Sequence, residues 1–191
     1  MSIYQTILER RSIRRFKQAI VDFDALDRCV NAARLAPTAN NRQRLQYIIV
    51  TKEPGLSSVF SSLSWAGYLE PRWEPGPGER PTAYIVILAD GPLKALGCDA
   101  GAAAENIVLT ALDAGVGACI LGSVEPEKVK KALSIPDTLR PILIVALGYP
   151  DERPISVDFE GSVKYWRDEN GVHRVPKRSL EAIRHIETYK T

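Results

Sequence analysis

The chain has 191 residues, of which 45% are hydrophobic and 25% are charged, and its formal net charge is +2 at pH 7. This composition is that of a globular protein and excludes a disordered or collagen-like chain. The near-neutral charge gives no electrostatic case for a nucleic-acid partner. At this length we expect one domain over residues 1–191, which buries roughly 70% of its unfolded surface.

The three cysteines, Cys29, Cys98 and Cys119, are unclustered and lie in apolar sequence. This arrangement favours reduced, buried thiols over disulfides, and we expect no metal site. No apolar run reaches the roughly 18 residues of a membrane span, and the amino-terminal residues lack the apolar core of a signal peptide. We therefore expect a cytoplasmic protein with no membrane partner.

Residues 2–10 predict a short helix, which runs directly into four arginines within six residues. Here Arg10, Arg11, Ser12 and Arg14 place planar guanidinium groups beside a hydroxyl, a combination that suits a phosphate clamp. From local sequence alone, a solvated basic turn explains the segment equally well.

A second helix, which Asp22 or Asp24 can cap, ends before Pro37. The loop after it combines small residues with the carboxamides of Asn41 and Gln43. Because a carboxamide donates and accepts hydrogen bonds at once, the loop suits a planar ring whose edge does both. The alternative is a plain polar loop.

Residues 46–51 and 83–89 are apolar, largely β-branched runs that predict two strands buried on both faces, and a short helix is expected near residues 55–63. Residues 64–81 contain four prolines and three glycines, which preclude regular structure over most of this length. Long aromatic loops of this kind are often functional lids.

A central helix is predicted between Asp99, as its N-cap, and a stop at Gly115. Its polar stripe consists of Asp99, Asn106, Thr110 and Asp113, and almost all of the remaining circumference is apolar or small. Such a helix must be covered nearly all round, so we expect it to pack on its own sheet and on a second protomer. An ordinary buried helix in a monomer is the alternative.

Two further strands are predicted at residues 118–121 and 141–147, with a short helix at residues 126–133 between them. His173 and His185 lie far from any motif in the polar tail, and we expect both on the surface.

The tail should end in an amphipathic helix, and a basic pair before this helix is a second candidate anion contact. The helix would carry Leu180, Ile183 and Ile186, and the pair is Lys177-Arg178.

The chain resembles the flavin-dependent members of the nitroreductase family nearly end to end. The resemblance is carried by Arg10-Arg11-Ser12-Ile13-Arg14, Ala36-Pro37-Thr38-Ala39-x-Asn41-x-Gln43, Asp99 through Gly122, Leu147-Gly148-Tyr149-Pro150, and Pro176-Lys177-Arg178-x-Leu180. It implies an α+β fold with a central mixed or antiparallel sheet flanked by helices. It also implies an intertwined homodimer with two FMN molecules at its interface.

The resemblance assigns contacts to the cofactor. The FMN phosphate and ribityl chain would be held by Arg10, Arg11, Ser12 and Arg14, joined by Lys177 and Arg178. The flavin ring would be met by Pro37, Thr38, Ala39, Asn41 and Gln43 of the other protomer. Flavin N5 would lie against the backbone of Leu121 and Gly122, where an N–H group stabilises the reduced ring.

The implied function is an FMN-dependent oxidoreductase that passes electrons by a ping-pong mechanism from NADH or NADPH to a small acceptor, such as a nitroaromatic or a quinone. No side chain acts as catalytic acid or base. The alternatives are an FMN carrier or sensor without fast turnover, and a dehalogenase or flavin-fragmenting enzyme of the same fold. Acceptor selection is expected in the 64–81 loop, through Trp65, Tyr68, Arg72 and Trp73.

The C-terminal extension, residues 151–191, would contact phosphate and dock its last helix on the partner. The chain departs from the family pattern in three places. Arg44-Leu45 stands where many relatives have Pro-Trp, and Lys177-Arg178 lacks the spacer of the family's Lys-x-Arg. The segment of residues 163–171 is longer than the shortest relatives would need, and the sequence gives no physical account of it.

Overall fold

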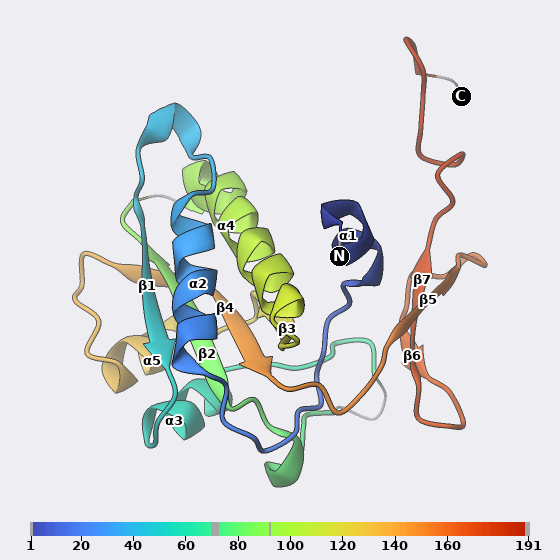
Figure 1. Ribbon diagram of the computed structural model, residues 1–191. Coiled ribbons are helices and arrows are strands. Elements are labelled where there is room, and N and C mark those ends of the chain that lie inside the picture. The colour runs from blue at the N-terminus through green and yellow to red at the C-terminus, as the bar shows by residue number, and fades with distance from the viewer. Residues whose placement is uncertain (1, 70–72, 92, 190–191) are drawn as a thin grey trace.

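The computed structural model describes residues 2–69, 73–91 and 93–189. Its centre is a four-stranded sheet in the order β1-β2-β4-β3, and every neighbouring pair is antiparallel (Figure 1). The strands are β1 (Leu45–Val50), β2 (Ala83–Ala89), β3 (Gly117–Leu121) and β4 (Arg140–Gly148). Strand β2 is buried along its whole length, as predicted. Strand β1 is an edge strand in which only Val50 is fully buried, so the prediction of two buried faces is wrong for it.

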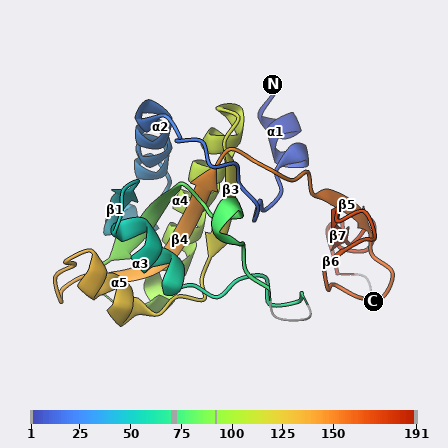
Figure 2. The same ribbon diagram turned by 90° about the horizontal axis from the view of Figure 1, so that it is seen from below.

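Helices cover both faces of this sheet (Figures 1 and 2). On one face, α2 (Phe23–Arg34) and α4 (Leu93–Asp113) share a core with Ile85 and Ile87 of β2. On the other face, α3 (Gly55–Ser61) and α5 (Pro126–Ala132) share a core with Tyr84, Val86 and Leu88. Successive side chains of a strand point to opposite faces, so the uninterrupted apolar run of β2 supplies both cores. The expected α+β architecture is confirmed.

Helix α4 begins earlier than predicted. It has 21 residues and starts at Leu93, so Asp99 lies inside the helix and is not its N-cap. The apolar stripe continues upstream of Asp99 with Leu96, which is buried, and this burial favours the additional turns. The predicted stop is confirmed: Gly115 has a φ of +72°, and Val116 N donates to Ala111 O across 2.8 Å, as in a glycine-terminated helix.

Helix α1 (Ile3–Glu9) lies beside the C-terminal part of α4 and leaves four apolar side chains exposed (Figure 1). These are Ile3, Tyr4, Ile7 and Leu8. Ser2 caps the helix through a hydrogen bond from Gln5 N. An apolar helix face without a cover in the described part of the chain is a feature of interaction surfaces.

The C-terminal segment contains a second, three-stranded sheet that the sequence analysis missed. Its strands are β5 (Ile155–Asp158), β6 (Trp166–Arg167) and β7 (His173–Lys177), in the order β5-β7-β6, with β5 parallel and β6 antiparallel to β7. It stands apart from the central sheet in both views (Figures 1 and 2). The unexplained segment 163–171 forms β6 and the turn into β7.

Three expectations about single residues or segments are wrong. The predicted last helix is a series of turns in which Leu180, Ile183 and Ile186 are exposed, because nothing in the described chain covers its apolar side. His173 is buried, with 1% of its surface exposed. Cys29 and Cys119 are buried as expected, whereas Cys98 is exposed near the start of α4.

Candidate cofactor site

The arginine-rich segment lies alongside the first residues of β3. Ser12 forms a parallel bridge with Ala118, and Ile13 N donates to Ala118 O across 2.9 Å. The two backbones approach closely because residue 117 is glycine: a Cβ there would lie 2.9 Å from Cγ1 of Ile13. The segment is therefore an ordered, partly buried extension of the sheet, not a solvated turn.

The other end of this segment is fastened to the end of β4. Phe16 forms an antiparallel bridge with Pro150, and Lys17 N donates to Tyr149 O across 2.8 Å. A Cβ at Gly148 would lie 2.8 Å from Cδ1 of the fully buried Phe16. The Gly148-Tyr149-Pro150 motif thus has a structural role, because it allows the arginine segment to cross the sheet here.

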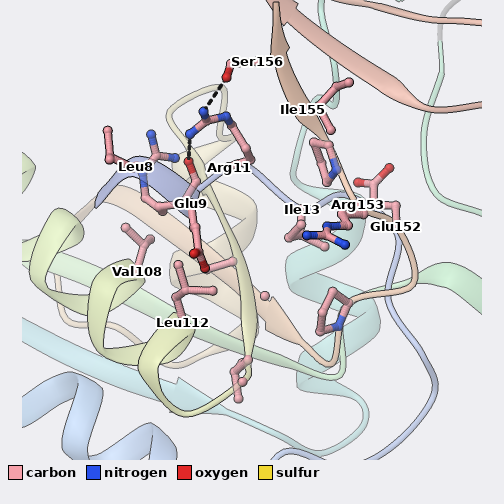
Figure 3. Close-up of a pocket in the computed structure, with 17 residues that line it drawn as sticks. Leu8, Glu9, Arg11, Ile13, Val108, Leu112, Glu152, Arg153, Ile155 and Ser156 are labelled. Carbon is pink, nitrogen blue, oxygen red and sulfur yellow. Dashed lines mark hydrogen bonds between the residues drawn. The ribbon is translucent and has the colours of Figure 1, made fainter. Parts of the chain in front are cut away.

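A cavity of about 510 Å³ opens beside this segment, between α1, the C-terminal end of α4 and the chain entering β5 (Figure 3). Arg10, Arg11 and Arg153 line it together with apolar side chains that include Val108 and Leu112. Oxygen atoms hold Arg10 and Arg11 in place: Arg11 Nη2 lies 2.8 Å from Ser156 Oγ, Arg11 Nη1 donates to Arg10 O, and Arg10 Nε lies 3.4 Å from Glu105 Oε1. Burial, followed by the neighbouring Arg10 cation, lowers the pKa of Arg11.

Glu152 fixes the backbone of the arginine segment from the opposite side. Its Oε1 atom accepts hydrogen bonds from the backbone N–H groups of Arg14 and Arg15. Its Oε2 atom lies 2.7 Å from Nη2 of Arg167, and both side chains are largely buried. No sequence motif marked Glu152, since its contacts join three segments that are remote in the chain.

The side chain of Arg14 packs against the C-terminal sheet. Its guanidinium carbon lies 4.8 Å from the centre of the Tyr165 ring, and Nη1 lies 3.3 Å from Nε2 of His173. The Nε atom of Arg14 is buried and has no hydrogen-bond partner among the described residues. Burial, followed by the charge of Arg14, lowers the pKa of His173 to about 4, so the imidazole is neutral at pH 7.

The loop after α2 holds several residues in left-handed backbone conformations. The φ values are 52° for Asn40, 52° for Asn41 and 49° for Gln43, a region that is strained for glutamine. Thr38 Oγ1 accepts from Gln43 N across 3.2 Å, and Gln43 Nε2 donates to Asn41 Oδ1 across 3.1 Å. The side chains of Asn41 and Gln43 are exposed, so the loop presents both carboxamides at the surface.

One chain brings only part of the predicted set together. Of the predicted residues, Arg10 and Arg11 line the cavity, while Ser12 and Arg14 follow on the same segment. Within the described chain, none of Pro37, Thr38, Ala39, Asn41, Gln43, Leu121, Gly122, Lys177 and Arg178 lines it.

Leu121 and Gly122 lie at the far end of β3 from the cavity. Leu121 is buried and Gly122 is exposed. At about 3.3 Å per strand residue, Gly122 is about 13 Å from Ala118, which lines the cavity. Lys177 and Arg178 are exposed at the end of β7, where Arg178 donates to Ala182 O across 3.1 Å.

The 64–81 loop is partly fastened to this region. Trp65 is 4% exposed and stacks on Phe60 with ring centres 5.7 Å apart, so it belongs to the core in this structure. Tyr68 is 47% exposed and lies against Tyr165, and Trp73 lies 5.8 Å from the guanidinium carbon of Arg15. The predicted contact Arg72 lies outside the described residues.

Neither a metal site nor a membrane-spanning helix is found in the part of the chain that the structure describes. It contains no group of three or more His, Cys, Asp or Glu side chains that could hold a metal ion. Among its helices, none combines the length and the hydropathy needed to cross a membrane.

Comparison with known proteins identifies the family. Residues 7–83 and 79–149 match the sequence profile of the nitroreductase family. A protein of Archaeoglobus fulgidus, provisionally named NADH dehydrogenase/NAD(P)H nitroreductase, is 31% identical over 155 residues, which cover 76% of this chain and 84% of that protein. The FMN reductase (NADPH) of Bacillus subtilis is 27% identical, over 76% of this chain and 65% of its own length.

The solved structures agree with the sequence comparisons. A nitroreductase family protein of Clostridium novyi superposes with a TM-score of 0.66 at 28% identity, over 78% of this chain and 87% of that one. The matched residues include the arginine segment, the 37–43 loop, α4 and the Gly148-Tyr149 motif, whose contacts in this structure are described above. The chain belongs to the nitroreductase family.

Proposed function

We propose that this chain is an FMN-dependent oxidoreductase that takes electrons from NADH or NADPH and passes them to a small acceptor, such as a nitroaromatic or a quinone, in a ping-pong cycle. The observation that carries the proposal is the ordered arginine segment beside β3, with Arg10 and Arg11 lining a cavity. The name of the Bacillus subtilis relative, FMN reductase (NADPH), supports chemistry between a flavin and a nicotinamide nucleotide.

The residues present fit FMN. Guanidinium groups with a fixed backbone suit a phosphate, and Arg14 retains a buried Nε–H group with no acceptor in the described chain. The phosphate end of the site would lie near Ala118 of β3, and the ring end near the exposed Gly122 just after β3. These two positions are about 13 Å apart along the strand. Because Gly122 has no side chain, its backbone can approach a planar ring closely.

We further propose a homodimer in which the partner completes each site. The exposed carboxamides of Asn41 and Gln43 do not line the cavity of their own chain, and neither does Lys177. Exposed apolar side chains on α1 and on residues 180–189 supply surface for such an interface. The C-terminal segment would then dock on the partner, where its apolar residues would become buried.

When bound, FMN would supply the hydride and electron chemistry. The chain's own residues would do the remaining work. Arg10, Arg11 and Arg14 would orient the phosphate and ribityl chain, and the backbone at Gly122 would donate to the ring edge that gains charge. No described side chain is proposed as acid or base. His173 is buried, its imidazole is neutral at pH 7, and its Nε2 atom already contacts Arg14.

The two buried, protonated thiols, Cys29 and Cys119, suit a reducing compartment, and we propose a cytoplasmic location.

Anaerobic half-reactions test the proposal. FMN-loaded protein should lose its visible flavin absorbance within seconds of mixing with NADH or NADPH, and it should regain the absorbance when a quinone or a nitroaromatic is added. A carrier or sensor would bind FMN but would be reduced or reoxidised far more slowly. Reduction by neither nucleotide would contradict the proposed donor, and reduction without reoxidation by any acceptor would favour the carrier.

A further inference from the structure

Helix α4 carries a buried carboxylate that accepts a hydrogen bond from another segment of the chain. Asp99 is 5% exposed and lies six residues after the start of α4. Its Oδ1 atom accepts a hydrogen bond from Ala39 N across 3.0 Å, so the bond joins segments 60 residues apart. Burying a carboxylate costs free energy, and a hydrogen bond to its charge offsets part of this cost.

Ala39 begins the 3-10 turn Ala39–Asn41, in the loop whose backbone is strained. The other side-chain bonds of this loop, which Gln43 N donates to Thr38 Oγ1 and Gln43 Nε2 donates to Asn41 Oδ1, are internal to it. Internal bonds fix the shape of the loop but not its placement on the protein. Within the described chain, the bond that Ala39 N donates to Asp99 Oδ1 is the one side-chain hydrogen bond that joins residues 38–43 to another segment.

We propose that Asp99 is a positioning residue for the flavin-contacting loop: by anchoring Ala39 to the rigid α4 helix, it holds the carboxamides of Asn41 and Gln43 in a binding-competent orientation. The inference rests on the proposed function, since it deepens the role assigned to this loop. Asp99 itself does not touch the cofactor. Its effect on FMN runs through the backbone of residues 39–43, which a preformed hydrogen bond keeps in place before binding.

The chain offers a matched control on the same helix. Asn106 lies seven residues further along α4 and donates from Nδ2 to Ala32 O across 2.9 Å, near the end of α2. It therefore makes a similar cross-helix hydrogen bond that ends outside the loop. Removing it should lower the stability of the fold without displacing Asn41 and Gln43.

The test compares FMN dissociation constants, measured by quenching of flavin fluorescence, with urea unfolding of the apoprotein as the second readout. Asp99→Ala should weaken FMN binding roughly tenfold or more, the range for loss of a hydrogen bond to a charged group. Asp99→Asn keeps an oxygen acceptor for Ala39 N and should restore binding to within about threefold of wild type. Asn106→Ala should bind FMN as wild type does while unfolding at lower urea.

If Asp99→Ala does not fold, Asp99→Ser replaces it, because a helical serine can satisfy its own hydroxyl by donating to the carbonyl four residues earlier, while Ala39 N still loses its carboxylate acceptor. It should lose FMN affinity like the alanine variant. FMN binding by the alanine or serine variant within threefold of wild type would overturn the inference, and so would an asparagine variant as weak as alanine. Failure of the FMN assignment would look different, since wild-type protein would then not bind FMN at all. Failure of the proposed turnover alone, as in a carrier, would leave FMN binding and therefore this comparison intact.

Discussion

Nε2 of His173 lies 3.3 Å from Nη1 of Arg14, and this contact couples the C-terminal sheet to the arginine segment. The guanidinium can only donate, so Nε2 must accept and the proton must reside on Nδ1. The Nδ1 atom is buried with no hydrogen-bond partner in the described part of the chain. Protonation of Nε2 in addition to Nδ1 would make the imidazole a cation, and this cation would lie directly against Arg14.

Stability should consequently fall as the pH is lowered between about 6.5 and about 4. The pKa of His173 is lowered to about 4 in the fold, so in this window the unfolded chain binds a proton that the native protein does not. The loss should reach up to about 3 kcal/mol and should level off below about pH 4. The groups that face the imidazole are Arg14, Glu152, Arg167 and Tyr165.

Urea unfolding at pH 7 and pH 4.5 measures this dependence. His173→Gln is the matched variant, because its amide oxygen can accept from Arg14 and does not titrate in this window. The variant should show a markedly flatter pH profile than wild type. Equal slopes in the two proteins would mean that His173 contributes nothing to the acid sensitivity of the fold.

Two aromatic residues of the 64–81 loop should respond differently to truncation. Trp65→Ala removes a ring that is 4% exposed and should cost about 3–5 kcal/mol of folding free energy. Tyr68 is 47% exposed, so Tyr68→Ala should cost less than about 1 kcal/mol. Its effect should instead appear in the oxidative half-reaction, as a changed preference among acceptors or faster reoxidation by oxygen.

Thermal unfolding and the two half-reactions separate these effects. The Tyr68 variant should accept electrons from NADPH at the wild-type rate. If its reoxidation by quinone, nitroaromatic and oxygen is also unchanged, the exposed part of the loop takes no part in acceptor selection.

Arg10→Ala and Lys177→Ala should each weaken FMN binding by about 1.5–3 kcal/mol, as expected for hydrogen bonds to a charged phosphate. Arg10 also lies 3.4 Å from Glu105, so its removal disturbs an ion pair on α4. Glu105→Gln removes the charge of that pair while it keeps Arg10 in place, and it should bind FMN at least as tightly as wild type. Equal losses in Arg10→Ala and Glu105→Gln would assign the effect to the ion pair.

The elements that the sequence predicted well are those with strong local signals. The unbroken apolar run of β2 and the glycine stop of α4 needed no tertiary information. Asp99 was misassigned because a polar residue next to an apolar run looks like an N-cap, whereas its partner Ala39 lies 60 residues away. The periodicity of residues 180–186 predicted a helix, but a short helix needs a packed apolar face to be stable.

The C-terminal sheet had no comparable signal. Strand β6 has two residues, and β7 includes Pro176, which is disfavoured within sheets. Contacts between side chains that are remote in the sequence help to hold this sheet in place. One of them is the 2.7 Å ion pair between Arg167 and Glu152. The arginine segment and the 37–43 loop were found from their motifs. No motif marked their supports Glu152 and His173, and Asp99 was marked as a helix cap and not as a support of the loop.

A mixed dimer tests whether two chains share each site. One chain would carry Arg10→Ala and Arg11→Ala, and the other Asn41→Ala and Gln43→Ala, with different affinity tags. If the phosphate clamp and the ring loop of a site come from different chains, the mixed dimer has one intact site and should hold about half the FMN of wild type. FMN content as low as in either parent homodimer would place the whole site within one chain.

The most direct test of the central claim, a site built for FMN, is titration of the apoprotein with flavins, followed by absorbance and fluorescence. We predict saturable binding of one FMN per chain, with riboflavin much weaker because it offers no phosphate to Arg10 and Arg11. FAD should also bind more weakly, because the described residues offer no evident adenylate site. Failure of FMN to bind, or riboflavin binding as tightly as FMN, would contradict the assignment of the arginine segment as a phosphate clamp.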